Sequence, residues 1–265
     1  MTGASRVPTS GTSALGCRLR DWSFTTRECA GVARDGRTRG LIVDLDDTLY
    51  PHEHWVQSGL MAVARHLEDT NGITAMDAFS TMSEARRNGE RGRELQAACA
   101  RFGLPAELVP TLLGVYRAHS PVLRLPKASA VALATLRAAQ WRLVILTNGL
   151  PAIQRAKIAA LGLPALVDSV VYADEHAEGG KPSPAVFREA LRRLGVSPRR
   201  CVCAGDDPVR DITGARQLGI STIRVATANA QVDPSADDAD AVIDSIDKLP
   251  AVAAYLLDAV RTDAA

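Results

Sequence analysis

Leu41-Ile-Val-Asp-Leu-Asp-Asp-Thr-Leu49 is the segment of this 265-residue chain from which its fold can be predicted. The segment opens with three apolar residues and continues into a cluster of carboxylates, a pattern typical of a buried central strand in a parallel sheet. In open parallel sheets, ligands bind outside the carboxyl ends of the strands. The segment therefore predicts a central strand and, directly after it, polar groups that face a ligand.

The chain beyond residue 120 alternates between short apolar runs and helical patterns. Such βα repeats predict an α/β fold with a doubly wound, Rossmann-like parallel sheet. The expected strands are 142–146, 169–172, 201–204, 221–225 and 241–243, and the expected helices are 128–139, 152–161, 184–194, 208–218 and 249–261.

Residues 53–120 interrupt this alternation directly after the first strand. Their apolar residues recur at helical spacing, and Asn71-Gly72 and Gly103 break the pattern. This predicts an inserted all-α domain at 53–120, with the sheet domain formed by 40–52 and 121–265. The apolar stripes are Trp55, Leu60, Met61, Val63, Ala64 and Leu67, followed by Leu95, Ala98, Cys99 and Phe102.

Residues 1–39 are rich in Ser, Thr, Gly and Arg and lack a sustained apolar period, which predicts a poorly ordered extension. Their Arg-rich character loosely fits a transit peptide, but a flexible tail or an upstream start codon is favoured.

Composition points to a cytoplasmic globular protein. The chain is 46% apolar and 23% charged, and its net charge of +1 gives no reason to expect nucleic acid or an anionic membrane as a partner. No apolar stretch reaches the roughly 20 residues that a membrane span needs. The cysteines form no CxxC pair, which favours free thiols in a reducing compartment; they are Cys17, Cys29, Cys99, Cys201 and Cys203.

The first of four polar segments is Asp44-Leu-Asp46-Asp-Thr48. A carboxylate such as Asp44 suits attack on phosphorus, because it forms an acyl phosphate that water can cleave. Asp46, two residues later, has the spacing to protonate the leaving alkoxide and then deprotonate the attacking water. The two carboxylates repel each other, and a divalent cation would relieve that repulsion. Taken alone, the segment also fits an acidic strand end or a helix cap.

The second and third segments offer groups that bind phosphate. Thr147-Asn148-Gly149 follows an expected strand, and a hydroxyl with backbone amides at such a turn can bind phosphate oxygens. Lys181 lies in Glu178-Gly-Gly-Lys-Pro-Ser-Pro184, where its ammonium offers a point charge. Neither segment is decisive alone, because Thr-Asn-Gly is a common turn sequence and most single lysines are solvated.

The fourth segment is Gly205-Asp206-Asp207-Pro-Val-Arg-Asp211, after the expected strand 201–204. Mg²⁺ prefers oxygen ligands and keeps several waters, so one or two carboxylates suffice here. By itself the segment also fits a capped turn. Because parallel strands end at the same edge of a sheet, the four segments are expected to converge.

With these four segments in this order, the chain resembles the haloacid dehalogenase superfamily of phosphohydrolases over roughly residues 40–245. The resemblance implies that Asp44 attacks phosphorus and that Asp46 acts as general acid and then general base. It also implies that Thr147, Asn148 and Lys181 hold the phosphoryl oxygens.

The same resemblance implies that Mg²⁺ is the cofactor. Its ligands would be the carboxylates of Asp44 and Asp206 and the backbone carbonyl of Asp46. Asp211 would lie behind the metal and orient Lys181 or a metal-bound water, and Asp207 would share the metal or tune its charge.

The insertion at 53–120 matches the position of the family's helical cap, which closes over the substrate. The resemblance thus assigns leaving-group selection to the cap and its hinges, at Tyr50-Pro51 and 121–126. Six residues would be placed to face the substrate, although packing or surface roles are favoured for each: His52, His54, Trp55, Arg86, Arg87 and His119.

The main hypothesis is a Mg²⁺-dependent phosphohydrolase that cleaves a small phosphomonoester through a phosphoaspartyl intermediate. A sugar phosphate or a nucleoside monophosphate is the expected partner, with no nucleic acid or membrane; the oligomeric state is open. A haloacid dehalogenase would use the same nucleophile but needs no metal, so Asp46 and Asp206 argue against it. A phosphomutase of the same superfamily is a third hypothesis and a non-catalytic binding module a fourth. The presence of all four segments disfavours the binding module.

Overall fold

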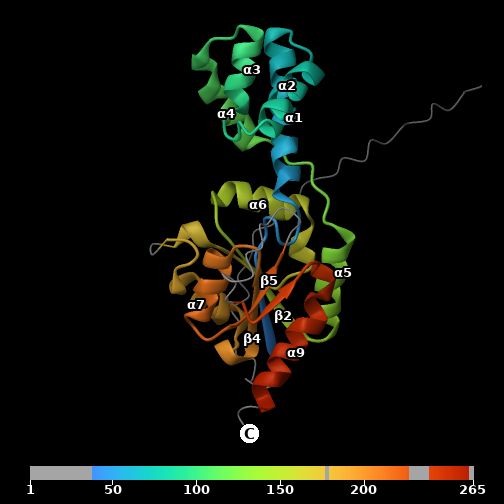
Figure 1. Cartoon of the computed structure of the whole chain (residues 1–265), viewed down its shortest axis with the longest axis vertical. Helices are drawn as coiled ribbons and strands as arrows, with labels where there is room; N and C mark the ends of the chain where they lie inside the picture. The colour runs from blue at the N-terminus through green and yellow to red at the C-terminus, as the bar shows by residue number, and fades with distance from the viewer. Residues whose placement is uncertain (1–37, 177–178, 227–238, 263–265) are drawn as a thin grey trace, which may run out of the picture. The chain divides into compact units, whose positions relative to one another are not determined.

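The computed structural model in Figure 1 describes residues 38–176, 179–226 and 239–262. The extension predicted at 1–39 therefore lies outside the described residues except for its last two, as do Cys17 and Cys29. The first strand begins at Arg39, one residue before the expected start of the sheet domain. Cys99, Cys201 and Cys203 are buried free thiols.

Six parallel strands form one sheet in the order β3-β2-β1-β4-β5-β6, which confirms the predicted doubly wound core. The chain runs from β1 outward to β3 and then returns to β4 on the other side of β1. Such a switch point is where ligands bind in open α/β sheets. The strands are β1 Arg39–Val43, β2 Trp141–Thr147, β3 Ser169–Tyr172, β4 Cys201–Gly205, β5 Ser221–Val225 and β6 Ala241–Ile243.

Helices cover both faces of the sheet, and β1 is apolar throughout for that reason. Successive side chains of a strand point to opposite faces. Leu41 and Val43 belong to the cluster packed by α5 (Lys127–Ala138) and α9 (Leu249–Thr262), whereas Ile42 belongs to the cluster packed by α7 (Pro184–Leu194). Figure 1 shows α5 and α9 on one side of the sheet and α7 on the other.

The helix expected at 208–218 is instead a π-helical segment followed by a short α-helix. Pro208 starts the segment, and the Asp207 side chain accepts hydrogen bonds from the Val209 and Arg210 amides at 2.9 and 2.7 Å. The remaining helical elements of the sheet domain are α6 Pro151–Ala160, η2 Leu163–Ala165, η3 Ala173–Glu175, η4 Pro198–Arg200, η5 Pro208–Thr213, α8 Gly214–Arg216 and η6 Ile246–Lys248.

Four α-helices lie between β1 and α5, where the sequence predicts a helical insertion; we call them the helical block. They are α1 His52–Asn71, α2 Ala75–Arg87, α3 Glu94–Phe102 and α4 Val109–Ala118, with η1 Ala106–Leu108 before α4. Gly72 and Gly103 end α1 and α3 at φ of 68° and 66°, a left-handed conformation that glycine adopts readily.

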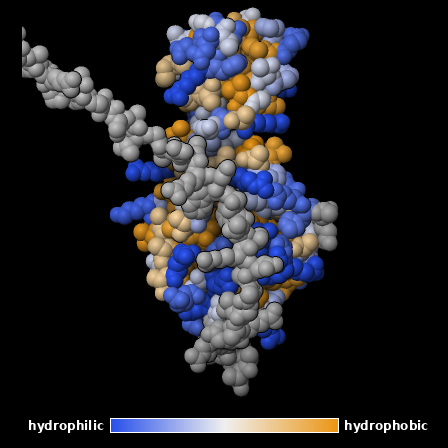
Figure 2. Space-filling model, turned by 180° about the vertical axis from the view of Figure 1, so that it is seen from behind, coloured by the Kyte–Doolittle hydropathy of each residue, from blue (hydrophilic) through white to orange (hydrophobic). Residues whose placement is uncertain are grey.

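The apolar stripes of the helical block form its core. Leu60, Val63 and Leu67 of α1 and Ala98 and Cys99 of α3 are buried in one cluster, which continues into the sheet domain. Figure 2 shows hydrophobic and hydrophilic residues interspersed over the face of the block seen from behind. Among the described residues, none of the helices has the length and apolar character needed to cross a bilayer.

Gly59 of α1 and Gly114 of α4 provide a matched test of this packing. A Cβ at Gly59 would lie 2.6 Å from the Tyr116 ring, whereas one at Gly114 would meet nothing within 4 Å. We expect Gly59→Ala to lower the free energy of unfolding by about 1–3 kcal/mol, because α1 and α4 must separate. Gly114→Ala should raise it by about 0.5–1 kcal/mol through helix propensity. Urea unfolding followed by circular dichroism measures both, and equal shifts would contradict the packing.

Candidate active site

The carboxyl ends of β1, β2 and β4 are level, and this brings the predicted segments together. Val43 pairs with Ile145 of β2 and with Ala204 of β4, and the Asp44 amide donates to the Ala204 carbonyl at 2.9 Å. A cavity of about 270 Å³ opens at this edge. Its lining contains all eight predicted site residues, namely Asp44, Asp46, Thr147, Asn148, Lys181, Asp206, Asp207 and Asp211.

The chain leaves β1 through a tight turn that aims both Asp44 and Asp46 into this cavity. Because β1 ends at Val43, Asp46 no longer follows strand alternation. Asp47 takes a left-handed φ of 58°, its amide donates to the Tyr50 carbonyl at 2.9 Å, and its carboxylate accepts from the His52 amide at 3.0 Å. This turn leads directly into α1.

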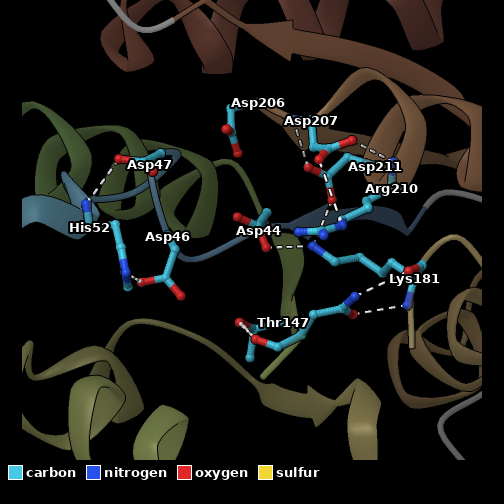
Figure 3. A pocket seen from close by; sticks show the side chains of 11 residues that line it. Asp44, Asp46, Asp47, His52, Thr147, Lys181, Asp206, Asp207, Arg210 and Asp211 are labelled. Carbon is cyan, nitrogen blue, oxygen red and sulfur yellow. Dashed lines mark hydrogen bonds and ion pairs between the residues drawn. The ribbon is translucent and has the colours of Figure 1, made fainter. Parts of the chain in front are cut away.

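Lys181 lies between two buried carboxylates. Its Nζ donates to Asp44 Oδ1 and to Asp211 Oδ1, the latter at 2.6 Å, and the residue is 7% exposed (Figure 3). Burial alone would lower the pKa of Lys181, but the charges of Asp44 and Asp211 outweigh it and raise that pKa. Asn148 fixes the loop: its side-chain oxygen accepts from the Lys181 amide at 2.9 Å, and its NH₂ donates to the Lys181 carbonyl at 3.1 Å.

Three carboxylates could together hold a metal ion. Oxygen atoms of Asp44, Asp206 and Asp211 lie within 4.8 Å of one another. Burial raises the pKa of Asp44 to about 8 despite Lys181, and burial with the charge of Asp211 raises that of Asp206 to about 6. A set of oxygen ligands whose mutual repulsion is only partly compensated fits a hard divalent cation.

Asp211 contacts Lys181, the residue it was expected to orient, and its carboxylate also lies close enough to Asp44 and Asp206 to join them around an ion. Gly205 permits the approach: a Cβ there would lie 2.2 Å from Asp211 Oδ2. The Asp211 side chain also accepts a hydrogen bond from the Asp207 amide, which donates to Oδ2 at 3.1 Å. The Asp207 carboxylate accepts hydrogen bonds from amides at the start of η5, so Asp207 acts as the N-cap of that segment.

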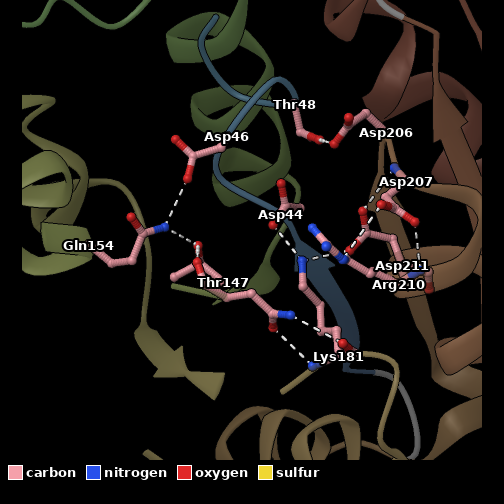
Figure 4. A network of polar contacts seen from close by, with 12 residues as sticks. Asp44, Asp46, Thr48, Thr147, Gln154, Lys181, Asp206, Asp207, Arg210 and Asp211 are labelled. Atoms are coloured by element: carbon pink, nitrogen blue, oxygen red, sulfur yellow. Dashed lines mark hydrogen bonds and ion pairs between the residues drawn. The ribbon is translucent and has the colours of Figure 1, made fainter. Parts of the chain in front are cut away.

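Asp46 is held apart from the carboxylate cluster by residues of α6. Lys157 Nζ lies 2.8 and 2.9 Å from its two carboxylate oxygens, and Gln154 Nε2 donates to Oδ2 at 2.9 Å. Gln154 also donates to Thr147 Oγ1, and so connects the acid to the predicted phosphate-binding hydroxyl (Figure 4). Lys157 is 3% exposed and lies 4.8 Å from the centre of the Trp55 ring.

Residues on the other side of Asp46 belong to the turn and to the start of α1. Tyr50 donates its hydroxyl to Asp46 Oδ1 at 2.7 Å, and His52 Nδ1 lies 3.0 Å from the same oxygen. Burial alone would raise the pKa of Asp46, but the hydrogen bond from His52 and the charge of Lys157 hold it well below its usual range. Asp46 is therefore an ionised carboxylate in this arrangement.

Gln154 and Lys157 were not among the site residues predicted from the sequence. Both lie on the buried side of α6, together with Ile158. A sequence signal was present, because two polar residues occupy positions i and i+3 of a helix whose next buried residue, at i+4, is apolar. Of the six residues considered near the substrate, His52 lines the cavity.

The sequence matches the model of the haloacid dehalogenase-like hydrolase family over residues 38–219. The chain belongs to this family. It is 31% identical to the glyceraldehyde 3-phosphate phosphatase of Methanopyrus kandleri, covering 76% of this chain and 89% of the relative. It is 38% identical to the phosphoserine phosphatase of Thermus thermophilus over 42% of this chain and 44% of that protein. Among solved structures, a 2-haloacid dehalogenase of Pseudomonas syringae superimposes with a TM-score of 0.55 at 25% identity, covering 82% and 99% of the two chains.

The carboxylate cluster predicts how pH affects the stability of this hydrolase. The pKa values of Asp44 (about 8) and Asp206 (about 6) lie above the ordinary value of 3.8. At pH values between 3.8 and these raised pKa values, the folded protein therefore binds more protons than the unfolded chain. This unfavourable contribution is present above these pKa values and disappears as the pH falls through them. Mg²⁺ should therefore raise the melting temperature more at about pH 8 than at about pH 5, where protons compete for the carboxylates.

Thermal unfolding with EDTA and with millimolar Mg²⁺ at both pH values measures this difference. Asp206→Asn should reduce the Mg²⁺-induced shift at about pH 8, because one ligand is lost. A Mg²⁺-induced shift that grows on acidification would show that these carboxylates do not bind the cation.

Lys157→Met tests the environment of Asp46. The substitution removes a cation 2.8 Å from the carboxylate, so the pKa of Asp46 should rise. Lys127→Met, at an exposed position of α5, is the matched control and should leave that pKa unchanged. Carboxyl ¹³C NMR titration measures both, and an unshifted Asp46 in the Lys157 variant would show that Lys157 does not set the ionisation of Asp46.

Proposed function

We propose that this chain is a Mg²⁺-dependent phosphatase that cleaves a small phosphomonoester through a phosphoaspartyl intermediate on Asp44. The observation that carries the proposal is the buried Asp44 carboxylate, paired with Lys181 and clustered with Asp206 and Asp211. Similarity to a glyceraldehyde 3-phosphate phosphatase over most of both chains supports a phosphomonoester as substrate.

Asp44 must be ionised to attack phosphorus, and Lys181 favours that form. The Lys181 ammonium donates to one Asp44 oxygen, while a bound Mg²⁺ would supply the further positive charge that the cluster lacks. Asp44, Asp206 and Asp211 are the carboxylates that would hold this ion. Lys181 would also neutralise the incoming phosphoryl group, so that one anion can approach another.

Thr147 is the proposed hydroxyl ligand of the phosphoryl oxygens. Thr147 belongs to the cavity lining, and its Oγ1 accepts a hydrogen bond from the Gln154 side-chain amide, which orients the hydroxyl. Asn148 contributes by fixing the loop that carries Lys181. Its side chain is therefore a positioning group, and the backbone amide after Thr147 remains the expected phosphate donor in this segment.

Asp46 is the proposed general acid and base. Its lowered pKa keeps Asp46 ionised, which is the form that takes a proton from the attacking water in the second step. In the first step Asp46 must carry a proton. The negative charge of an incoming phosphate group favours that protonation by raising the pKa of the nearby carboxylate.

The helical block is the proposed cap over this site. Two chain segments connect it to the sheet domain, at 50–51 and at 119–126, and the Val122 amide in the second segment donates to Ser58 Oγ of α1 at 2.9 Å. A cap that closes on these connections would exclude bulk water during phosphoryl transfer and release product on opening.

A dehalogenase is the second candidate, because the fold is shared with a 2-haloacid dehalogenase. That reaction uses a carboxylate nucleophile without a metal. The clustered carboxylates of Asp206 and Asp211, and the anchoring of Asp46 by Lys157, would have no evident use in it. These residues favour the phosphatase.

Asp44→Asn should abolish Mg²⁺-dependent hydrolysis of an aryl phosphate, lowering kcat by at least about a thousandfold through loss of the nucleophile. Asp46→Asn should slow both formation and hydrolysis of the phosphoenzyme. Asp69→Asn, at an exposed position of α1, is the control and should retain full activity.

Phosphate release measured with and without EDTA tests these variants together with the metal. Retained activity in Asp44→Asn would show that Asp44 is not the nucleophile. Turnover that EDTA does not change would show that the reaction needs no divalent metal. Chloride release from 2-chloropropionate in the absence of a metal would identify the dehalogenase instead.

A further inference from the structure

A second cavity, of about 230 Å³, lies within the helical block. Its lining comes from α1, α3, α4, the end of α2 and the loop after it. His52 lines this cavity and the catalytic one, so the two share a wall. The His52 ring also contacts Asp46, with Nδ1 3.0 Å from the Asp46 Oδ1 atom. His52 therefore places the second cavity next to Asp46, the residue proposed to protonate the leaving oxygen.

One side of this cavity is apolar. Aliphatic side chains from three helices form it, and the Tyr116 ring closes it beside Trp55, with ring centres 4.9 Å apart. A surface of this kind favours methylene or methyl groups, since burying them removes apolar area from water. The aliphatic residues are Val56, Leu60, Leu95 and Leu113.

The polar side of the cavity contains a guanidinium whose charge is already compensated. Arg86 Nε lies 3.0 and 2.9 Å from the two Glu53 carboxylate oxygens, and its Nη1 donates to Glu94 Oε1 at 2.8 Å. The Arg86 and Glu94 side chains are only 16% and 10% exposed. Glu94 also lies in the first turn of α3, where it complements the helix dipole.

Among the described residues that line this cavity, an anionic leaving group would therefore meet no uncompensated cation. Its charge would lie beside Glu94, and His52, the other basic residue in the lining, is paired with Asp46. Like charges placed together in a partly buried site cost considerable binding energy. A hydroxyl or carbonyl group, by contrast, can bond to the remaining N–H groups of Arg86 or to the Glu94 carboxylate.

The size of the cavity sets a second limit. Sites for drug-sized ligands occupy about 300–1,000 Å³. At about 230 Å³ this cavity admits a chain of a few carbon and oxygen atoms. Of the two substrate classes that the sequence suggests, it favours a short sugar phosphate over a nucleoside monophosphate.

Building on the phosphatase activity proposed above, we infer that this cavity binds the leaving group and selects a short, uncharged alcohol with an apolar portion. The apolar side chains contact its carbon chain, and Arg86 and Glu94 bond to its oxygen atoms. Substrates that carry a carboxylate or a second phosphate in the leaving group are rejected by charge, and nucleosides by size.

Two probes with the same three-carbon skeleton test the charge selection in the unmodified protein. Glyceraldehyde 3-phosphate has an uncharged leaving group, whereas 3-phosphoglycerate carries a carboxylate in place of the aldehyde. We expect kcat/KM to be at least about tenfold higher for the aldehyde, and adenosine monophosphate to be hydrolysed no better than 3-phosphoglycerate. Equal or reversed rates for the three-carbon pair would overturn the inference.

Acetyl phosphate separates this inference from the proposed function, because its leaving group is too short to depend on the second cavity. If Mg²⁺-dependent hydrolysis is absent for acetyl phosphate, for the three-carbon esters and for an aryl phosphate alike, the phosphatase proposal itself fails. If acetyl phosphate is hydrolysed but the three-carbon substrates are not distinguished, the phosphatase stands and the leaving-group site is wrong.

Two variants locate the selection within the cavity. Glu94→Gln leaves Arg86 with one carboxylate partner, so the preference for glyceraldehyde 3-phosphate over 3-phosphoglycerate should shrink severalfold. Leu113→Trp fills the cavity and should raise KM for glyceraldehyde 3-phosphate by at least about tenfold, with a smaller effect on acetyl phosphate. Glu84→Gln, on the exposed side of α2, is the matched control and should change none of these values.

Circular dichroism shows whether each variant is folded. If folded Glu94→Gln and Leu113→Trp proteins keep the substrate preference and KM of the unmodified protein, the cavity has no part in leaving-group selection.

Discussion

The contact of one buried ammonium with two buried carboxylates is the constraint on which the rest of the site depends. Carboxylates removed from water are costly unless they are paired, and Lys181 provides the pairing for Asp44 and Asp211. One positive charge cannot compensate three carboxylates, which is why the pKa values of Asp44 and Asp206 remain raised. The uncompensated charge is what suits the site to a divalent cation and a phosphate group together.

A second lysine gives the neighbouring carboxylate the opposite environment. Asp44 and Asp46 are two residues apart, yet burial raises the pKa of the first while Lys157 and His52 lower that of the second. Two carboxylates with different ionisation preferences can divide the work of nucleophile and proton carrier. The fold achieves this by ending β1 at Val43, so that the turn aims each side chain at a different lysine.

The two cavities assign different tasks to the two parts of the chain. The strand ends carry the charged groups suited to a phosphoryl group, and ion pairs through Lys181 hold two of these carboxylates in place. The helical block carries an apolar surface and a compensated ion pair around Arg86, which suit an uncharged remainder of the substrate. His52 contributes to both linings, since it begins the helix that connects the turn after β1 to the block.

The parallel α/β core, the helices inserted after β1 and eight of the eleven described residues that line the catalytic cavity could be predicted from the sequence, because these follow from local periodicity and from motifs that sit at strand ends. Only the tertiary structure showed that Gln154 and Lys157 anchor Asp46, that Asp211 joins the carboxylate cluster and that Asp207 caps η5. Each of these depends on distances between elements remote in sequence. Residue spacing along a chain fixes which face a side chain takes, but it does not fix which charge that side chain will meet.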